Sequence, residues 1–140
     1  MSLSTIPGKT VTVLRSALLT DIGGAAAFLE QASLAHGKEK RPELFRAAFS
    51  ELNGFCLLLD AIGWSEPDDP STQGPVFVDF DMCRRLAADA MRSKLKGEQE
   101  FVVERAAEKN EDTLYQQAVA DIKAIETFLA NHGSAARRCD

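Results

Sequence analysis

The chain has 140 residues, of which 45% are apolar and 26% are charged, proportions that are ordinary for one globular domain. A chain of this length buries roughly two-thirds of the surface that its unfolded form exposes, so its folding does not require a metal or a disulfide. The net charge of −5 argues against general binding of nucleic acid or of anionic membranes. We expect a single domain over residues 1–140, with an ordered core over about 10–132 and flexible termini.

The first predicted helix runs from about Thr10 to His36. Gly23 and Gly24 interrupt its middle, where each glycine costs about 0.5–1 kcal/mol relative to alanine. With the alanines that follow they form a patch of small side chains. One interpretation is close packing against a neighbouring helix of the same chain, or a kink. The other is a flat surface for self-association, made by Gly23, Gly24 and Ala27. Apolar residues recur along one helical face at Val11, Leu14, Leu18, Ile22, Ala25, Leu29 and Ala32.

The second predicted helix runs from Pro42 to about Ile62, since proline is favoured at a first helical position and Gly63 ends the pattern. Its last two turns are apolar nearly all round, so we expect it to be the most buried helix. A long connection over 63–79 follows, in which three prolines exclude a regular helix. Connections of this length are often functional or cross over another element. Its apolar triplet Val76–Val78 is too short to predict a sheet.

The third predicted helix runs from Phe80 to Lys109, with Asp79 or Asp81 as its cap. Gly97 divides its charges as a helix boundary would, but one glycine is short for a helix reversal, so we favour a continuous helix. Asn110 and Asp112 are better suited to a turn and a cap.

The fourth predicted helix runs from about Thr113 to Asn131. The fold class is therefore all-α. One apolar stripe on each helix predicts an antiparallel four-helix bundle, or five helices if Gly97 separates two of them, with one long Pro-rich connection at 63–79.

The chain carries none of the sequence motifs that enzymes of this size commonly use. Neither His36 nor His132 has a glutamate three residues before it, as a di-iron bundle requires. Neither follows an arginine at the four-to-six-residue spacing of the HEPN-type ribonucleases. The three cysteines form no CxxC pair, and no glycine-rich phosphate loop is present. We expect no catalytic residue, no metal and no cofactor.

One region stands out in and just after the long connection, because it combines aromatic, acidic and basic side chains. Trp64 and Phe77 could plug one end of the bundle while an aspartate caps a helix. The same residues could instead form a partner groove, since aromatic and arginine side chains dominate binding energy at interfaces. A metal on Asp79 and Asp81 would lack further ligands. The candidate residues are Trp64, Phe77, Asp79, Asp81, Arg84 and Arg85.

The leading hypothesis is a non-catalytic helical bundle that acts through protein–protein interaction and self-associates, as a homodimer or another homo-oligomer. The alternative is a small-ligand-binding protein or enzyme with a site near Trp64, Asp79 and Arg85. A third hypothesis, a regulatory partner of a toxin or nucleotidyltransferase, is based on fold analogy alone. We expect no nucleic-acid or membrane partner. We also expect a cytoplasmic location, because residues 1–9 lack the apolar core of a signal peptide and the apolar stretch Ile22–Leu29 is far shorter than the ~20 residues that span a bilayer.

Overall fold

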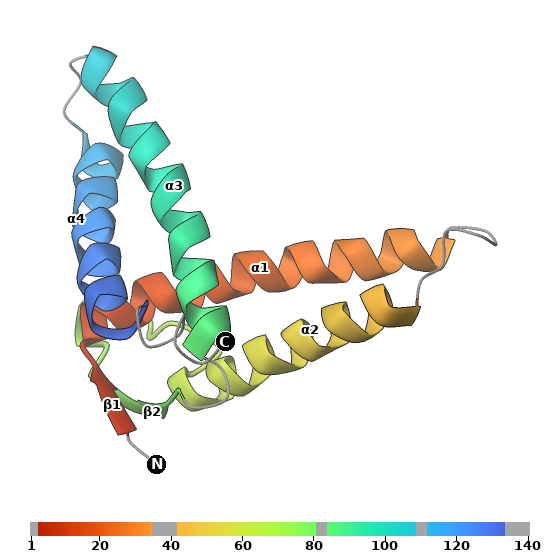
Figure 1. Cartoon of the computed structure of the whole chain (residues 1–140). Coiled ribbons are helices and arrows are strands. Elements are labelled where there is room, and N and C mark those ends of the chain that lie inside the picture. Colours follow the sequence, from red (N-terminus) through yellow and green to blue (C-terminus); the bar gives the residue numbers. More distant parts are fainter. Residues whose placement is uncertain (1–2, 35–41, 81–83, 109–111, 134–140) are drawn as a thin grey trace.

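The computed structural model of the chain describes residues 3–34, 42–80, 84–108 and 112–133 (Figure 1). Within these ranges it confirms the all-α class, since the strands are confined to one short two-stranded ribbon. None of the helices in these ranges combines the length and the apolar character of a membrane span. In chain order the elements are β1 (Leu3–Ile6), α1 (Gly8–Leu34), α2 (Pro42–Ile62), the 3-10 turn η2 (Pro70–Thr72), β2 (Val76–Asp79), α3 (Arg84–Glu108), α4 (Thr113–Phe128) and the π-helical turn η3 (Leu129–Gly133).

The four helices form two antiparallel pairs that diverge from a common base (Figure 1). Helices α1 and α2 make one arm, and α3 and α4 make the other. The arms meet where the N-terminal half of α1 contacts both α3 and α4. The helices therefore do not lie side by side along their whole lengths, as the predicted bundle would place them. The far half of each arm packs mainly against its partner helix (Figure 1).

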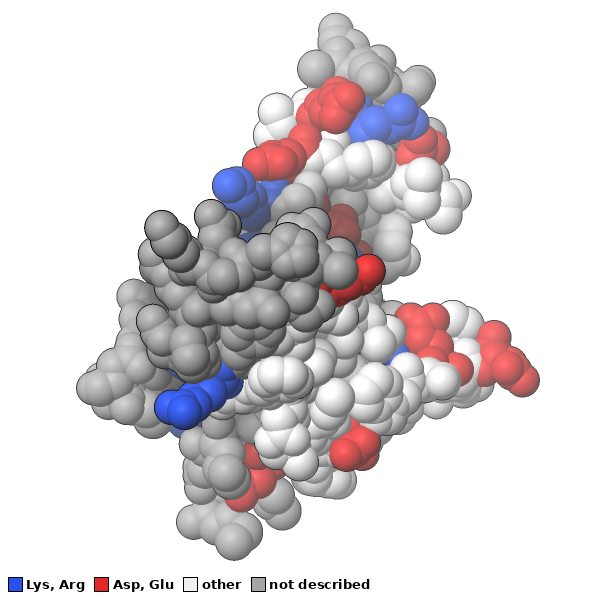
Figure 2. Space-filling model, turned by 90° about the vertical axis from the view of Figure 1, so that its right-hand side faces the viewer, with Lys and Arg blue, Asp and Glu red and all other residues white. Residues whose placement is uncertain are grey.

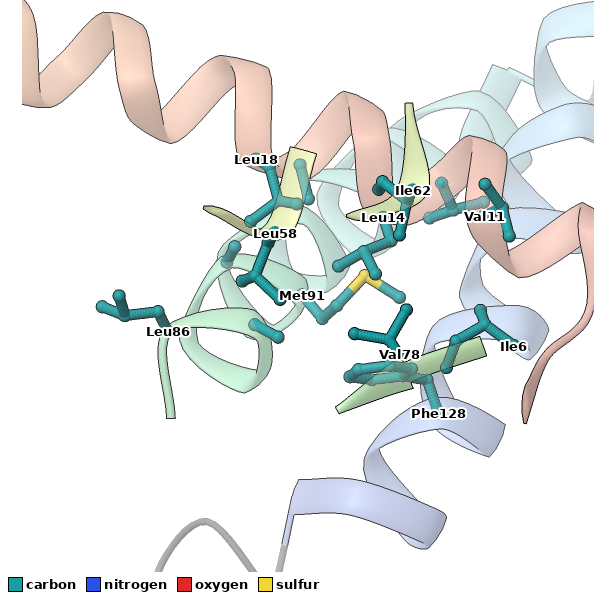
Figure 3. Close-up of a cluster of buried hydrophobic side chains, with 14 of the residues drawn as sticks. Ile6, Val11, Leu14, Leu18, Leu58, Ile62, Val78, Leu86, Met91 and Phe128 are labelled. Atoms are coloured by element: carbon teal, nitrogen blue, oxygen red, sulfur yellow. The ribbon is translucent and has the colours of Figure 1, made fainter. Parts of the chain in front are cut away.

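The hydrophobic core lies at this base, where all four helices and the ribbon contribute side chains (Figure 3). Its fully buried members fill the space between the crossing helices, with Met91 near the centre of the view. Burying a side chain of this size contributes about 1.5–3 kcal/mol, so the base supplies most of the hydrophobic stabilisation. The labelled core residues of Figure 3 are Ile6, Val11, Leu14, Leu18, Leu58, Ile62, Val78, Leu86, Met91 and Phe128.

The two-stranded ribbon places regular structure before residue 10, outside the expected core, and includes the triplet Val76–Val78, which was too short to predict a sheet. Strand β1 pairs antiparallel with β2, so that Leu3 lies opposite Asp79 and Ile6 lies opposite Val76. Ile6 and Val78 on the inner face are 1% and 2% exposed, which attaches the ribbon to the core. Burial of one face compensates for the shortness of the strands, since an isolated two-stranded hairpin is only marginally stable in water.

The helix boundaries follow the local signals closely. Gly63 ends α2 with a φ of +98°, a conformation that side chains other than glycine adopt with strain. Helix α3 continues through Gly97, as expected for four helices rather than five. Asp112 caps α4, as predicted, by accepting a hydrogen bond from the Tyr115 backbone N–H at 2.8 Å. The expected turn residue Asn110 lies outside the described residues.

The connection after α2 crosses over the start of α1, as its length indicated. A Cβ placed on Gly8 would lie 2.0 Å from the carbonyl oxygen of Gln73, so the two backbones approach more closely than any larger residue allows. Glycine at this position therefore lets the connection pass over α1 before it enters β2.

Candidate functional site

The small-residue patch of α1 is an open surface. Gly23, Gly24, Ala26 and Ala27 are exposed, and a Cβ added to either glycine would meet nothing within 4 Å. The interpretation that these glycines allow close packing within the chain is therefore wrong. The helix also runs without a break from Gly8 to Leu34, so the glycines do not end it. The hypothesis that a second copy of the chain packs on this patch stays a prediction.

Helix α2 is less buried than its composition indicated. Phe49 is 58% exposed and Leu57 is 46% exposed, although α1, β2 and α3 all contact this helix. Its opposite face packs closely: a Cβ on Gly54 would lie 2.2 Å from Leu86 of α3. The last two turns of α2 are therefore apolar nearly all round without being buried all round, and the α1/α2 arm presents large apolar side chains to its surroundings.

Trp64 does not plug the base of the molecule. Its side chain is 45% exposed, and its indole Nε1 donates to Asp60 Oδ1 at 2.7 Å. The ring borders a surface cleft of about 410 Å³ between α1 and the connection that follows α2. Asp79 and Arg85, the expected companions of Trp64, do not line this cleft. Its lining residues are Arg15, Ser16, Leu19, Thr20, Trp64 and Glu66.

Arg15 is a buried charged residue that the periodic pattern did not predict. It is only 3% exposed, and its guanidinium holds the end of α2 and the connection together. Its Nε donates to the Gly63 carbonyl at 2.8 Å, while Nη2 donates to Ile62 O at 3.1 Å and to Gln73 Oε1 at 2.9 Å. The negative end of the α2 dipole stabilises a cation at this place. The available indication was that Arg15 is the one charged residue between Lys9 and Asp21.

The two site candidates on β2 face outward. Phe77 is 65% exposed, and Asp79 is exposed on the same face, while Val78 between them points into the core. Phe77 is therefore no plug either. Asp79 belongs to the ribbon, and residues 81–83, which lead into α3, lie outside the described residues, so the expected capping role of Asp79 stays a prediction. The other candidate cap, Asp81, lies outside the described residues.

The arginines at the start of α3 have different surroundings. Arg85 lies on the surface with Arg92, and both contact Asp89, at 3.4 and 3.0 Å. Arg84 lies near His132, whose ring packs on Phe80 and Phe128 with centroid separations of 5.1 and 4.7 Å. Burial, and to a lesser extent the Arg84 charge, lowers the pKa of His132. The other histidine, His36, lies outside the described residues.

An acidic group marks the place where three helices cross. Asp21 of α1 lies within electrostatic range of Glu51 of α2 and Asp89 of α3. Burial raises the pKa of Asp21, and the two neighbouring carboxylates raise it further. Among the described residues, no three His, Cys, Asp or Glu side chains are grouped so that they could hold a metal ion.

A larger cleft, of about 640 Å³, lies between α1, the connection and α4. Asp121, 9% exposed, accepts a hydrogen bond there from Gln117 Nε2 at 2.8 Å. Two shallower grooves of about 260 and 290 Å³ adjoin Gly97. The walls of these cavities mix apolar side chains with hydroxyl, lysine and carboxylate groups. No family model, no curated protein and no solved structure matches this chain in the comparisons with known proteins.

Proposed function

We propose that the protein is a non-catalytic interaction module that pairs with a second copy of itself through the α1/α2 arm. The observation that carries this proposal is the pair of mid-helix glycines, Gly23 and Gly24, which face open space. Glycine in a helix interior destabilises the helix by about 0.5–1 kcal/mol relative to alanine. No described residue lies so close that a side chain at these two positions would clash with it. A helix of another molecule that packs closely at this place would require residues without a side chain.

The charge pattern of α1 favours a second copy as the occupant. Between Asp21 and Glu30 the helix carries no charged residue. In contrast, acidic and basic side chains alternate along the α3/α4 arm, in the upper part of Figure 2. Two copies that meet through the uncharged segment experience no like-charge repulsion there, although each has a net charge of −5. Phe49 and Leu57, exposed on α2 of the same arm, add apolar area of the kind that stable interfaces bury.

The alternative function, a ligand or catalytic site built from Trp64, Asp79 and Arg85 together, receives less support. Asp79 lies on the outer face of the ribbon, and Arg85 is occupied with Asp89 on the surface of α3. Neither residue lines the cleft beside Trp64.

Sedimentation velocity at micromolar concentrations tests the proposal. We expect a dimer for the natural chain and a monomer for Ala27→Glu, because two copies of the new carboxylate would be desolvated against each other. The matched control is Val103→Glu, which adds the same charge at a position 70% exposed on the other arm and leaves the dimer intact. A natural chain that remains monomeric at 100-fold higher concentration contradicts the proposal, as does equal dissociation by both variants.

A further inference from the structure

The cleft beside Trp64 combines a buried cation with two exposed apolar walls. Arg15 lies at its inner side, while the indole of Trp64 and the side chain of Leu19 are 45% and 42% exposed. Its volume of about 410 Å³ falls within the range of small-molecule sites. The α1 residues in its lining come before the glycine patch of the same helix.

The charge of Arg15 is incompletely compensated. Its three hydrogen bonds all go to uncharged oxygens, and it forms no ion pair with a described residue. Its remaining nitrogen, Nη1, is buried without a hydrogen-bond partner. Removing a guanidinium from water without a counter-charge is costly, and the carbonyls at the end of α2 offset only part of that cost. An anionic group in the adjoining cleft would lower the electrostatic free energy of this buried charge.

The remaining walls restrict the shape and charge of such an anion. The hydrogen bond to Asp60 orients the Trp64 ring, which lines the cleft together with Leu19. A flat aromatic ligand matches these walls, since ring pairs gain about 0.5–1.5 kcal/mol beyond the area they bury. The carboxylate of Glu66, also in the lining, repels anions of higher charge more strongly than a monoanion.

We propose that this cleft binds a small aromatic monocarboxylate. Its carboxylate lies over the Arg15 guanidinium, and its ring packs on Trp64 and Leu19. The inference does not depend on self-association, because it concerns different residues and a different readout.

Trp64 is the one tryptophan of the chain, so its fluorescence reports directly on the cleft. We expect phenylacetate to change the emission in a saturable manner, phenyl phosphate to bind more weakly, and benzylamine, which has the same ring but a positive charge, to have no saturable effect. The same titration of Ala27→Glu gives the same affinity, which separates ligand binding from self-association. Absence of saturation by phenylacetate, or an equal response to benzylamine, overturns the proposal.

Three variants locate the ligand without relying on a change that unfolds the protein. Glu66→Gln removes the repelling charge from an exposed side chain, and we expect about fivefold tighter phenylacetate binding. Leu19→Glu introduces a carboxylate into the wall and weakens binding by about tenfold or more. Asp68→Asn, the matched control, changes the net charge as Glu66→Gln does but lies outside the lining, and leaves the affinity within about twofold. Unchanged binding in both Glu66→Gln and Leu19→Glu contradicts the assignment of the site.

Discussion

The Nε of Arg15 donates a 2.8 Å hydrogen bond to the carbonyl oxygen of Gly63, the residue whose positive φ ends α2. One side chain of α1 thus completes the end of the neighbouring helix. The carbonyls in the last turn of a helix lack partners within that helix, and Arg15 supplies donors for two consecutive ones, at Ile62 and Gly63.

Replacing Arg15 by methionine is expected to lower the free energy of unfolding by about 2–3 kcal/mol, because two buried carbonyls and the Gln73 amide oxygen lose their donor. Urea denaturation followed by circular dichroism measures the change. Arg85→Met is the control, since that side chain is 56% exposed, and its effect should stay within about 0.5 kcal/mol. Equal effects of the two variants would show that Arg15 does not stabilise the end of α2.

Glycine-to-alanine substitutions at two positions of α1 are expected to have opposite signs. Gly23→Ala stabilises the monomer by about 0.5–1 kcal/mol, because the new Cβ meets no atom and the helix gains propensity. Gly8→Ala destabilises it by more than about 1 kcal/mol, because the Cβ would lie 2.0 Å from Gln73 O. Thermal unfolding at submicromolar concentration, where association does not contribute, compares them. A destabilising Gly23→Ala would mean that the patch is covered within the monomer.

The acidic group at the helix crossing predicts a pH dependence. Because the pKa of Asp21 is raised in the folded protein, this residue favours folding below its unfolded pKa of about 3.9, and that contribution is lost as the pH rises through the folded pKa. We therefore expect Asp21→Asn to stabilise the protein at pH 7 and to have little effect near pH 3. Denaturation midpoints across this range test the sign, with Asp68→Asn as the control for net charge. A destabilised Asp21→Asn at pH 7 would contradict it.

The contribution of His132 to stability depends on pH in the opposite direction. Its pKa is lowered in the folded protein, so its contribution to stability is complete above the unfolded value of about 6.5 and is lost as the pH falls through the folded pKa. We expect the melting temperature to fall between pH 7 and pH 5. The decrease should be smaller in His132→Gln, which lacks the titrating group. Histidine NMR titration of the folded protein gives the pKa directly. A value at or above 6.5 for His132 would refute the prediction.

The four helices could be predicted because each has a local signal. A proline marks the start of α2, Gly63 marks its end, and Asp112 caps α4. The arrangement of the helices could not be predicted, because a stripe at helical spacing shows which face is buried but not which element covers it. The crossing of the two pairs depends on where α3 and α4 meet α1, and no local pattern encodes that place.

The site candidates show the same division. The small-residue patch at Gly23 and Gly24 could be recognised from composition alone, but its exposure could not. Trp64 was recognised, but its partner Arg15 was missed, because the burial of that guanidinium depends on carbonyls almost fifty residues further along the chain. The ribbon was missed for a related reason, since each strand is four residues long and is stabilised by the other.

The pairing of β1 with β2 closes the first half of the chain into a ring that contains α1, α2 and the connection over α1. Closing so long a ring carries an entropic cost that shorter contacts, such as those between α1 and α2, do not. The helix pair can therefore form before the ribbon does. Once the ribbon has formed, a single protease cut within the connection would leave both pieces associated through strand pairing and the shared core.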